Sequence, residues 1–228
     1  MLNNETIKII DRFRDIGWIP EPEAKRLFQT AGLNVPKYIW AHTPDEAIEF
    51  AHRTGFPVVA KVVSPRVIHK SDVGGVIVGI DTDERLEKAY YTFKALDGFN
   101  GMLVEEMVAG QELIIGAKID YQFGPVILLG IGGTGVEVYQ DVTMRMAPIN
   151  ENDVMSMIAS LKGKDIIMGF RGGEPINVKG LTDMMTGFSA MIINLEDHIQ
   201  SIDLNPVICS RDRCIIADAR IILKEALR

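Results

Sequence analysis

Lys61 stands in the middle of an apolar run, Val58 to Val63, that is typical of a β-strand. A lysine among apolar residues must reach solvent, lay its stem over apolar surface or meet an anion, because an unpaired buried charge is very costly. Two interpretations stay open: an edge-strand lysine that reaches solvent, or a lysine that binds a phosphate group of a nucleotide.

A polar, glycine-containing segment follows, from residue 64 to 76. Ser71 and the main-chain amides around Gly74 and Gly75 could cradle phosphate oxygens, since glycine lets the main chain approach a ligand closely and amides are donors. His69 adds an imidazole to the same segment. The alternative is an ordinary glycine turn with a surface histidine.

A second glycine cluster, residues 132–135, precedes two carboxylates and a guanidinium. Glu137, Asp141 and Arg145 beside main-chain donors would suit a site for a metal ion and phosphate groups. A flexible hairpin with solvated charges explains the same pattern equally well. Arg171 before two glycines is a further candidate anion contact, or simply part of a turn.

Asp203 and Asn205 lie two residues apart on an expected strand. Residues two apart on a strand point to the same side of it. Mg²⁺ prefers oxygen ligands, so this pair could hold a magnesium ion. The alternative is a strand end that runs into a turn.

Acidic residues surround Met107 and Val108, where one expected strand gives way to the next. Main-chain groups at such a hinge could hold the edge of an adenine, and a carboxylate beyond it, Glu112, could take ribose hydroxyls. Two charged strand ends are the simpler interpretation.

Composition limits the class of protein. The chain has 228 residues, 47% of them hydrophobic, and 24 basic against 31 acidic residues give a net charge of −7. This balance argues against nucleic-acid binding, which needs a basic face. The apolar runs are shorter than the ~20 residues of a membrane span, and the first residues lack the pattern of a signal peptide. We expect a cytoplasmic protein.

Helix and strand signals alternate along the chain in the way of an α+β or α/β protein. Thr43, Pro44 and Glu46 form a strong helix start, and Gly55 marks the end of that helix. We expect helices over residues 5–16, from 21 onward, 43–54, 83–97, 151–161 and 182–196, and strands over 35–40, 58–63, 76–80, 102–107, 112–119, 126–131, 143–147, 199–209 and 213–219.

The last two strands should form a hairpin around Arg211 and Asp212, which would set Cys209 opposite Cys214. A disulfide is sterically conceivable there. Disulfides are rare in the reducing cytoplasm, so we expect two reduced cysteines.

In this order, the segments resemble the ATP-grasp subunit of ADP-forming acyl-CoA synthetases, relatives of succinyl-CoA synthetase. The most specific is HKSDVGGV at residues 69–76; the others are EPEAKRLFQTAGLNVPKY, FPVVAKVVSPRVI, LVEEMVAGQELIIGAKID, FGPVILLGIGG, DVTMRMAPI, RGG and IDLNPV with DARI. The resemblance implies the ATP-grasp fold, with two α+β lobes that hold the nucleotide between them. We expect an N-terminal arm (1–20), a first lobe (21–108) and a second lobe (109–228).

The same resemblance implies a role for each candidate. Residues assigned to ATP or ADP are Lys61 and Arg145 on the phosphates, Ser71 to Gly75 (including Gly74) in the loop over them, Glu105 to Val108 (including Met107) at the adenine, and Glu112 at the ribose. Asp203, Asn205 and Glu137 would serve Mg²⁺.

The implied activity is acyl-CoA + ADP + phosphate ⇌ acid + ATP + CoA, carried out with a CoA-binding, phosphohistidine-bearing large subunit in a hetero-oligomer. His69 would carry the phosphoryl group to ADP or would only hydrogen-bond it; both roles stay open. Two other functions also remain possible: a different ATP-grasp ligase that joins a carboxylate to an amine, and a non-catalytic nucleotide sensor.

Overall fold

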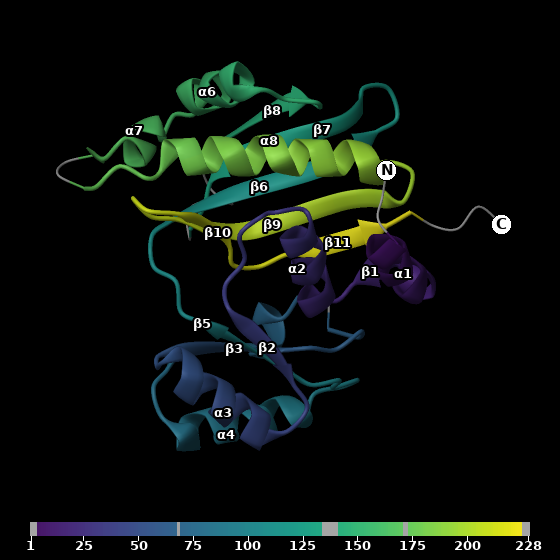
Figure 1. Cartoon of the computed structure of the whole chain (residues 1–228), viewed down its shortest axis with the longest axis vertical. Coiled ribbons are helices and arrows are strands. Elements are labelled where there is room, and N and C mark those ends of the chain that lie inside the picture. Colours follow the sequence, from purple (N-terminus) through teal and green to yellow (C-terminus); the bar gives the residue numbers. More distant parts are fainter. Residues whose placement is uncertain (1–3, 68, 134–140, 171–172, 225–228) are drawn as a thin grey trace. The chain divides into compact units, whose positions relative to one another are not determined.

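The computed structural model in Figure 1 describes residues 4–67, 69–133, 141–170 and 173–224. The chain forms two compact units. Residues 36–108 make the small unit, and residues 1–35 together with 109–228 make the large unit.

The small unit is an antiparallel four-stranded sheet in the order β2-β5-β3-β4. Alternate strand residues such as Ala60, Val62 and Val104 lie in a hydrophobic core with the helices α3 and α4, which cover one face of the sheet (Figure 1). The elements are β2 (Tyr38–Ala41), α3 (Pro44–Thr54), β3 (Val58–Val62), η2 (Ser71–Val73), β4 (Val76–Ile80), α4 (Asp83–Lys94) and β5 (Met102–Glu106).

Helix α3 shows why the local signals were reliable. The Thr43 hydroxyl accepts a hydrogen bond from the Glu46 amide at 3.3 Å, and the Glu46 carboxylate accepts one from the Thr43 amide at 3.3 Å. This reciprocal capping satisfies amides that the first turn leaves without partners. At the other end Gly55 adopts φ 95°, a conformation that side chains disfavour. The predicted bounds of this helix, 43–54, agree with α3 to within one residue.

The large unit is built on a seven-stranded sheet, in the order β1-β11-β9-β6-β7-β8, with β10 paired to β9. Helices α6, α7 and α8 lie over one face of this sheet (Figure 1). The elements are α1 (Asn4–Phe13), η1 (Arg14–Ile16), β1 (Trp18–Ile19), α2 (Glu21–Thr30), β6 (Gln111–Asp120), β7 (Gly124–Ile131), β8 (Val142–Met146), α6 (Glu151–Ser160), α7 (Lys164–Ile167), α8 (Val178–Leu195), β9 (Ile199–Cys209), β10 (Cys214–Ile216) and β11 (Arg220–Leu223).

Residues 21–35 belong to the large unit and not with 36–108, where we expected them. Leu27 and Phe28 of α2 are buried in the core of the large unit, and the Phe28 ring lies 6.5 Å from that of Phe188 on α8. The short strands β1 and β11, which pair with each other, were not predicted, because strands of two and four residues are too short for a periodic pattern to be detected. No helix among the described residues is long and apolar enough to cross a bilayer.

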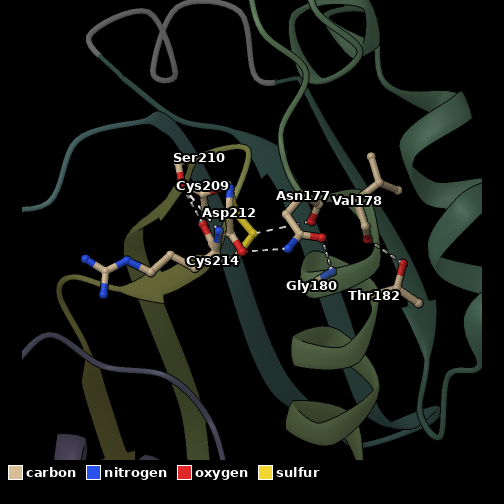
Figure 2. Close-up of a disulfide and its surroundings, with 9 residues drawn as sticks. Asn177, Val178, Gly180, Thr182, Cys209, Ser210, Asp212 and Cys214 are labelled. Atoms are coloured by element: carbon tan, nitrogen blue, oxygen red, sulfur yellow. Dashed lines mark hydrogen bonds between the residues drawn. A yellow bond between two sulfur atoms is a disulfide. The ribbon is translucent and has the colours of Figure 1, made fainter.

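The two cysteines form a disulfide, contrary to the expectation of free thiols. Strand pairing sets Cys209 opposite Cys214, as predicted, with their Cα atoms 4.1 Å apart. Figure 2 shows the bridge beside Asn177, whose side chain donates to the Asp212 carbonyl at 2.8 Å and accepts from the Gly180 amide at 2.8 Å. The register was readable from the sequence, whereas the oxidation state was inferred only from an assumed compartment.

We expect reduction of this disulfide to lower the free energy of unfolding by ~2 kcal/mol, the value that loop-closure entropy gives for a loop of about six residues. Urea titrations with and without dithiothreitol measure the difference, and alkylation followed by mass spectrometry verifies the redox state. A Cys209→Ala, Cys214→Ala variant that is insensitive to dithiothreitol serves as the control. Equal urea midpoints for the oxidised and reduced chains would contradict the expectation.

Candidate functional site

Lys61 does not reach solvent. It is 5% exposed, and its ammonium lies 3.0 Å from the carboxylate of Glu105, which is 2% exposed. β3 and β5 are paired with Val59 opposite Glu105, so both charged side chains project from the face that does not carry the core residues Ala60 and Val104. The ion pair balances a lysine charge whose burial would otherwise be very costly.

Glu105 therefore differs from its predicted place at an adenine hinge. Its main chain lies inside β5, paired with Tyr38 of β2 and with Val59 of β3, and its side chain meets Lys61. The Glu106 amide is also engaged, by the Lys37 carbonyl at 3.0 Å. Met107 and Val108 follow the end of the strand, and within the described residues no main-chain hydrogen bond joins either of them to the rest of the chain.

The loop from Lys70 to Gly75 is a tight, closed turn. The amides of Val73 and Gly75 donate to the Lys70 carbonyl at 3.3 and 2.7 Å, and the Gly74 amide donates to the Ser71 carbonyl at 3.2 Å. These internal bonds use the amides around Gly74 and Gly75 that we expected to face phosphate. Gly75 is required here for a different reason, since a Cβ would lie 2.5 Å from Val62 Cγ1.

His69 is exposed, immediately before this turn. Gly74 adopts φ 65° at its far end. His69 thus lies in the connection between β3 and η2, on a loop and not on a regular element.

Asp203 and Asn205 project from the same face of β9, as predicted. Ile202 and Leu204, which alternate with them, are buried in the large core. We call the opposite side the carboxylate face; it carries Asp203, Asn205, Gly116 and Glu112. Gly116 of β6 lies directly across from Asp203, so no side chain from that strand stands in front of the carboxylate.

Two residues that sequence reasoning missed lie beside Asp203. Arg220 pairs with it across β11 and β9, its guanidinium 4.0 Å from the carboxylate. Asp218 donates its amide to the Pro206 carbonyl at 3.3 Å, directly after Asn205. The sequence DARI contained both residues, but only the β9–β11 pairing brings them to Asp203.

Asp203 is half-buried, and burial raises the pKa of its carboxyl group. The Arg220 charge acts in the opposite direction and lowers this pKa, whereas the Asp218 charge raises it. Two carboxylates and an amide oxygen that gather in this way attract a cation, because a cation relieves both the desolvation and the repulsion.

These residues fit a Mg²⁺ site in which the protein supplies only a few of the ligands. Mg²⁺ in proteins is held by one or two carboxylates and completes its shell with phosphate oxygens and waters. Within the described residues no group of three or more His, Cys, Asp or Glu side chains is arranged to hold a metal ion. Asp203, Asn205 and Asp218 could therefore supply a few of the ligands, and phosphate oxygens and waters would have to supply the rest.

Arg145 does not join this group, which corrects its predicted role on the phosphates. In the register of the sheet Arg145 lies opposite Ile127, a core residue, and so on the face covered by helices. Its guanidinium donates to Ser156 of α6 at 2.8 Å and to the Met144 carbonyl at 2.8 Å. It joins strand to helix.

Asp141 also has a structural role, since its carboxylate accepts the amides of Lys162 and Gly163 at 2.8 and 2.7 Å. Glu137 and Arg171 lie outside the described residues. Glu112, the expected ribose contact, is exposed, and its carbonyl accepts the Gly132 amide at 2.8 Å.

Gly132 could not be replaced without moving this strand, because a Cβ would lie 2.7 Å from the carbonyl carbon of Glu112. The glycine cluster therefore starts in close contact with the main chain of β6. Glu112 lies on the carboxylate face, four residues along β6 from Gly116, or ~13 Å at the usual rise of a strand.

Residues 13–223 match a family described as ATP-grasp domain. The chain is 38% identical over 211 residues to the acetate–CoA ligase (ADP-forming) I subunit beta of Pyrococcus furiosus, covering 89% of this chain and 90% of that protein. It is also 38% identical over 211 residues to a 4-hydroxybutyrate–CoA ligase (ADP-forming) of Nitrosopumilus maritimus. That match covers 88% of this chain and 30% of the longer protein.

Two solved structures extend the likeness to the fold. A dinucleotide-forming acetyl-coenzyme A synthetase 1 of Ca. Korarchaeum cryptofilum, in complex with coenzyme A and Ca-AMPCP, superposes with a TM-score of 0.90 at 38% identity, covering 96% of this chain and 100% of that one. A second structure of that enzyme, with Mg-AMPPCP and a phosphohistidine segment that points towards the nucleotide binding site, gives 0.84 at 37% identity over 95% and 99%. The ATP-grasp fold is confirmed, and the chain belongs to the ATP-grasp family, with the ATP-grasp subunits of ADP-forming acyl-CoA synthetases among its relatives.

Proposed function

We propose that this chain is the nucleotide-binding subunit of an ADP-forming acid–CoA ligase and transfers a phosphoryl group between a phosphohistidine and ADP. The overall reaction is acyl-CoA + ADP + phosphate ⇌ acid + ATP + CoA. The observation that carries the proposal is the pair Asp203 and Asn205 on the carboxylate face, with Asp218 beside them, because this set of oxygen ligands suits a metal ion that arrives with phosphates.

Each residue has a physical task in this reaction. Asp203, Asn205 and Asp218 would hold Mg²⁺, which when bound neutralises charge on the phosphate oxygens. Phosphoryl transfer depends on positioning and on charge neutralisation more than on covalent help. Lys61 supplies fixed positive charge for the phosphates, with Glu105 holding its ammonium in place.

The base and sugar need separate contacts. The main-chain groups of Met107 and Val108 would hold the adenine edge, and the exposed carboxylate of Glu112 would accept the ribose hydroxyls. Ser71 offers its hydroxyl to a phosphate oxygen. Because the amides of the 70–75 turn are engaged internally, the hydroxyl is the donor we assign there.

His69 is the residue that we assign to phosphoryl transfer. An imidazole nitrogen of His69 attacks the phosphorus of a phosphohistidine on the partner, so that one N–P bond forms as the other breaks. An oxygen of the ADP β-phosphate then attacks the same phosphorus, which breaks the bond to His69 and forms ATP. Exposure and a loop position support this role, since a carrier must reach donor and acceptor in turn.

Relatives named as beta subunits belong to enzymes of more than one subunit. We propose a large partner subunit that binds CoA and bears the phosphohistidine, in a hetero-oligomer. We also propose a cytoplasmic location, because ADP and CoA are cytoplasmic substrates. The Cys209–Cys214 disulfide would then be one of the uncommon bridges that form in that compartment.

The decisive experiment measures ADP binding by the chain alone and acyl-CoA chemistry with and without the partner. We expect calorimetry to detect ADP binding that Mg²⁺ strengthens, and thioester chemistry only after the partner is added. Thioester formation by the isolated chain, or no binding of ADP in the presence of Mg²⁺, would refute the proposal.

Two variants separate the charge of Lys61 from the metal ligands in this experiment. Lys61→Met is combined with Glu105→Gln, because an unpaired buried carboxylate would cost ~3–5 kcal/mol of stability. The double variant should weaken ADP binding ~10- to 100-fold with or without Mg²⁺, since a hydrogen bond to a charged group is worth ~1.5–3 kcal/mol. Asp203→Ala should weaken it only when Mg²⁺ is present, and Lys179→Met, which breaks an exposed ion pair, is the control.

The raised pKa of Asp203 makes stability depend on pH in a defined direction. A carboxyl group whose pKa is raised by folding destabilises the fold when ionised, so the penalty is present at neutral pH and disappears below the unfolded value of ~3.9. Asp203→Asn should therefore raise the melting temperature of the metal-free chain at pH 7, and the gain should vanish near pH 3.

Asp120 is the matched control, because amides of Gln122 and Phe123 lower the pKa of its carboxyl group. Asp120→Asn should lower the melting temperature at pH 7 and lose this effect at low pH. A shift of the same sign for both variants would show that Asp203 is not destabilised by its charge.

His69→Ala should abolish an acid-labile, base-stable phosphate on this chain and stop ATP formation, while ADP affinity changes by less than about five-fold, the effect of one lost hydrogen bond. ³²P labelling of the complete enzyme, with phosphate release at low pH, provides the measurement. His69→Gln keeps a hydrogen-bond donor without a nitrogen able to carry phosphate. If either variant keeps a tenth or more of the wild-type turnover, His69 is a phosphate ligand and not a carrier.

A further inference from the structure

Lys25 of α2 is completely buried, with 0% of its side chain exposed. Its ammonium lies 2.9 Å from the carboxylate of Glu21, one helical turn earlier and also buried. The same ammonium donates a hydrogen bond of 2.7 Å to the main-chain carbonyl of Ala217. A buried ion pair costs desolvation energy and is weak evidence for stability by itself, so the hydrogen bond to the Ala217 carbonyl is the informative contact.

Ala217 precedes Asp218 in the connection between β10 and β11. β10 pairs with β9 up to Ile216, and β11 resumes pairing at Arg220. Residues 217–219 therefore lie outside the strand pairing on both sides. Their position depends on individual hydrogen bonds.

Those hydrogen bonds converge from two directions. The amides of Ala217 and Asp218 both donate to the Pro206 carbonyl, at 3.0 and 3.3 Å. The carbonyl of Ala217 receives the ammonium of Lys25. Pro206 directly follows Asn205, so this arrangement sets Asp218 at a fixed distance from Asn205 and from Asp203.

We propose that Lys25, with its charge balanced by Glu21, is a positioning residue that holds Asp218 in register with Asp203 and Asn205 for a nucleotide-bound Mg²⁺. The inference rests on the proposed function, because it concerns the same metal ligands. Lys25 touches neither metal nor nucleotide in this role; it acts through the Ala217 carbonyl.

Two variants that break the same ion pair separate this role from simple stabilisation. Lys25→Met removes the donor to Ala217, whereas Glu21→Gln removes the opposite charge and leaves the donor in place. A merely structural pair predicts that metal affinity falls in both variants in proportion to their loss of stability. A positioning role predicts that Lys25→Met loses far more metal affinity than Glu21→Gln.

The first readout is amide hydrogen exchange in the metal-free chain. In Lys25→Met the amides of Ala217 and Asp218 should exchange faster than in Glu21→Gln, relative to the amides of β6 and β7, which report on the whole unit. The second readout is Mn²⁺ affinity of the ADP-bound chain by electron paramagnetic resonance. Loss of an outer contact to metal ligands typically weakens metal affinity ~10- to 100-fold, and we expect that for Lys25→Met with less than ~3-fold for Glu21→Gln.

Lys179→Met is the matched control, since Lys179 forms an exposed pair with Asp183 four residues away on α8. It should change neither readout. The double variant Glu21→Gln, Lys25→Met leaves no buried charge, so it reports on the lost donor even where Lys25→Met alone folds poorly.

The outcomes distinguish this inference from the proposed function. A wild-type chain that binds no Mn²⁺ with ADP overturns the metal site and this inference together. The positioning role alone is overturned if the wild type binds Mn²⁺ and the Mn²⁺ affinity of Lys25→Met or of the double variant is within about two-fold of the wild-type affinity. Equal losses in Lys25→Met and Glu21→Gln overturn it as well.

Discussion

The two-residue alternation of β9 is the constraint on which the rest of the large unit depends. Ile202 and Leu204 must face the core, so Asp203 and Asn205 must face away from it. The same alternation passes through the pairings to β6, β7 and β8 and determines which side chains can meet the carboxylates. A shift of one residue in any pairing would exchange the two faces.

On the carboxylate face, the charged Asp203 side chain is only partly exposed to solvent. Asp203 is half-buried, and its ionised form is disfavoured by burial and by Asp218 but favoured by Arg220. An arrangement of this kind would favour reversible binding of a cation. In the small unit Lys61 is balanced by Glu105 in the same manner. Lys61 and Asp203 thus each have a neighbour of opposite charge.

Much of this could be predicted from the sequence, and the limits have physical causes. Capping at Thr43 and Glu46 is local, so the helix bounds were readable, and the turn between Cys209 and Cys214 fixed their register. Arg145 was misplaced because the choice of face depends on pairing with β7, which sequence spacing does not specify. Asp218 was missed because it lies in the connection between β10 and β11, whereas its neighbour Asp203 lies fifteen positions earlier, on β9.

The chemistry of single residues was harder to predict than their position. Glu105 was assigned to a nucleotide base, whereas it is the counter-charge of Lys61. The amides around Gly74 and Gly75 were assigned to phosphate, whereas they close their own turn. In both cases the residue type indicated a polar interaction, but the sequence did not show the partner, because tertiary contacts determine it.

Gly116 has a consequence for protein design. A methyl group at this position would meet only the Ile202 carbonyl at 3.4 Å and the Leu128 Cβ at 3.8 Å, both ordinary contacts, so the sheet would accept alanine without rearrangement. Larger side chains would stand directly in front of the Asp203 carboxylate. The size of the side chain at position 116 would therefore set how much room a hydrated ion has at the Asp203 carboxylate, and no charge on this face would change.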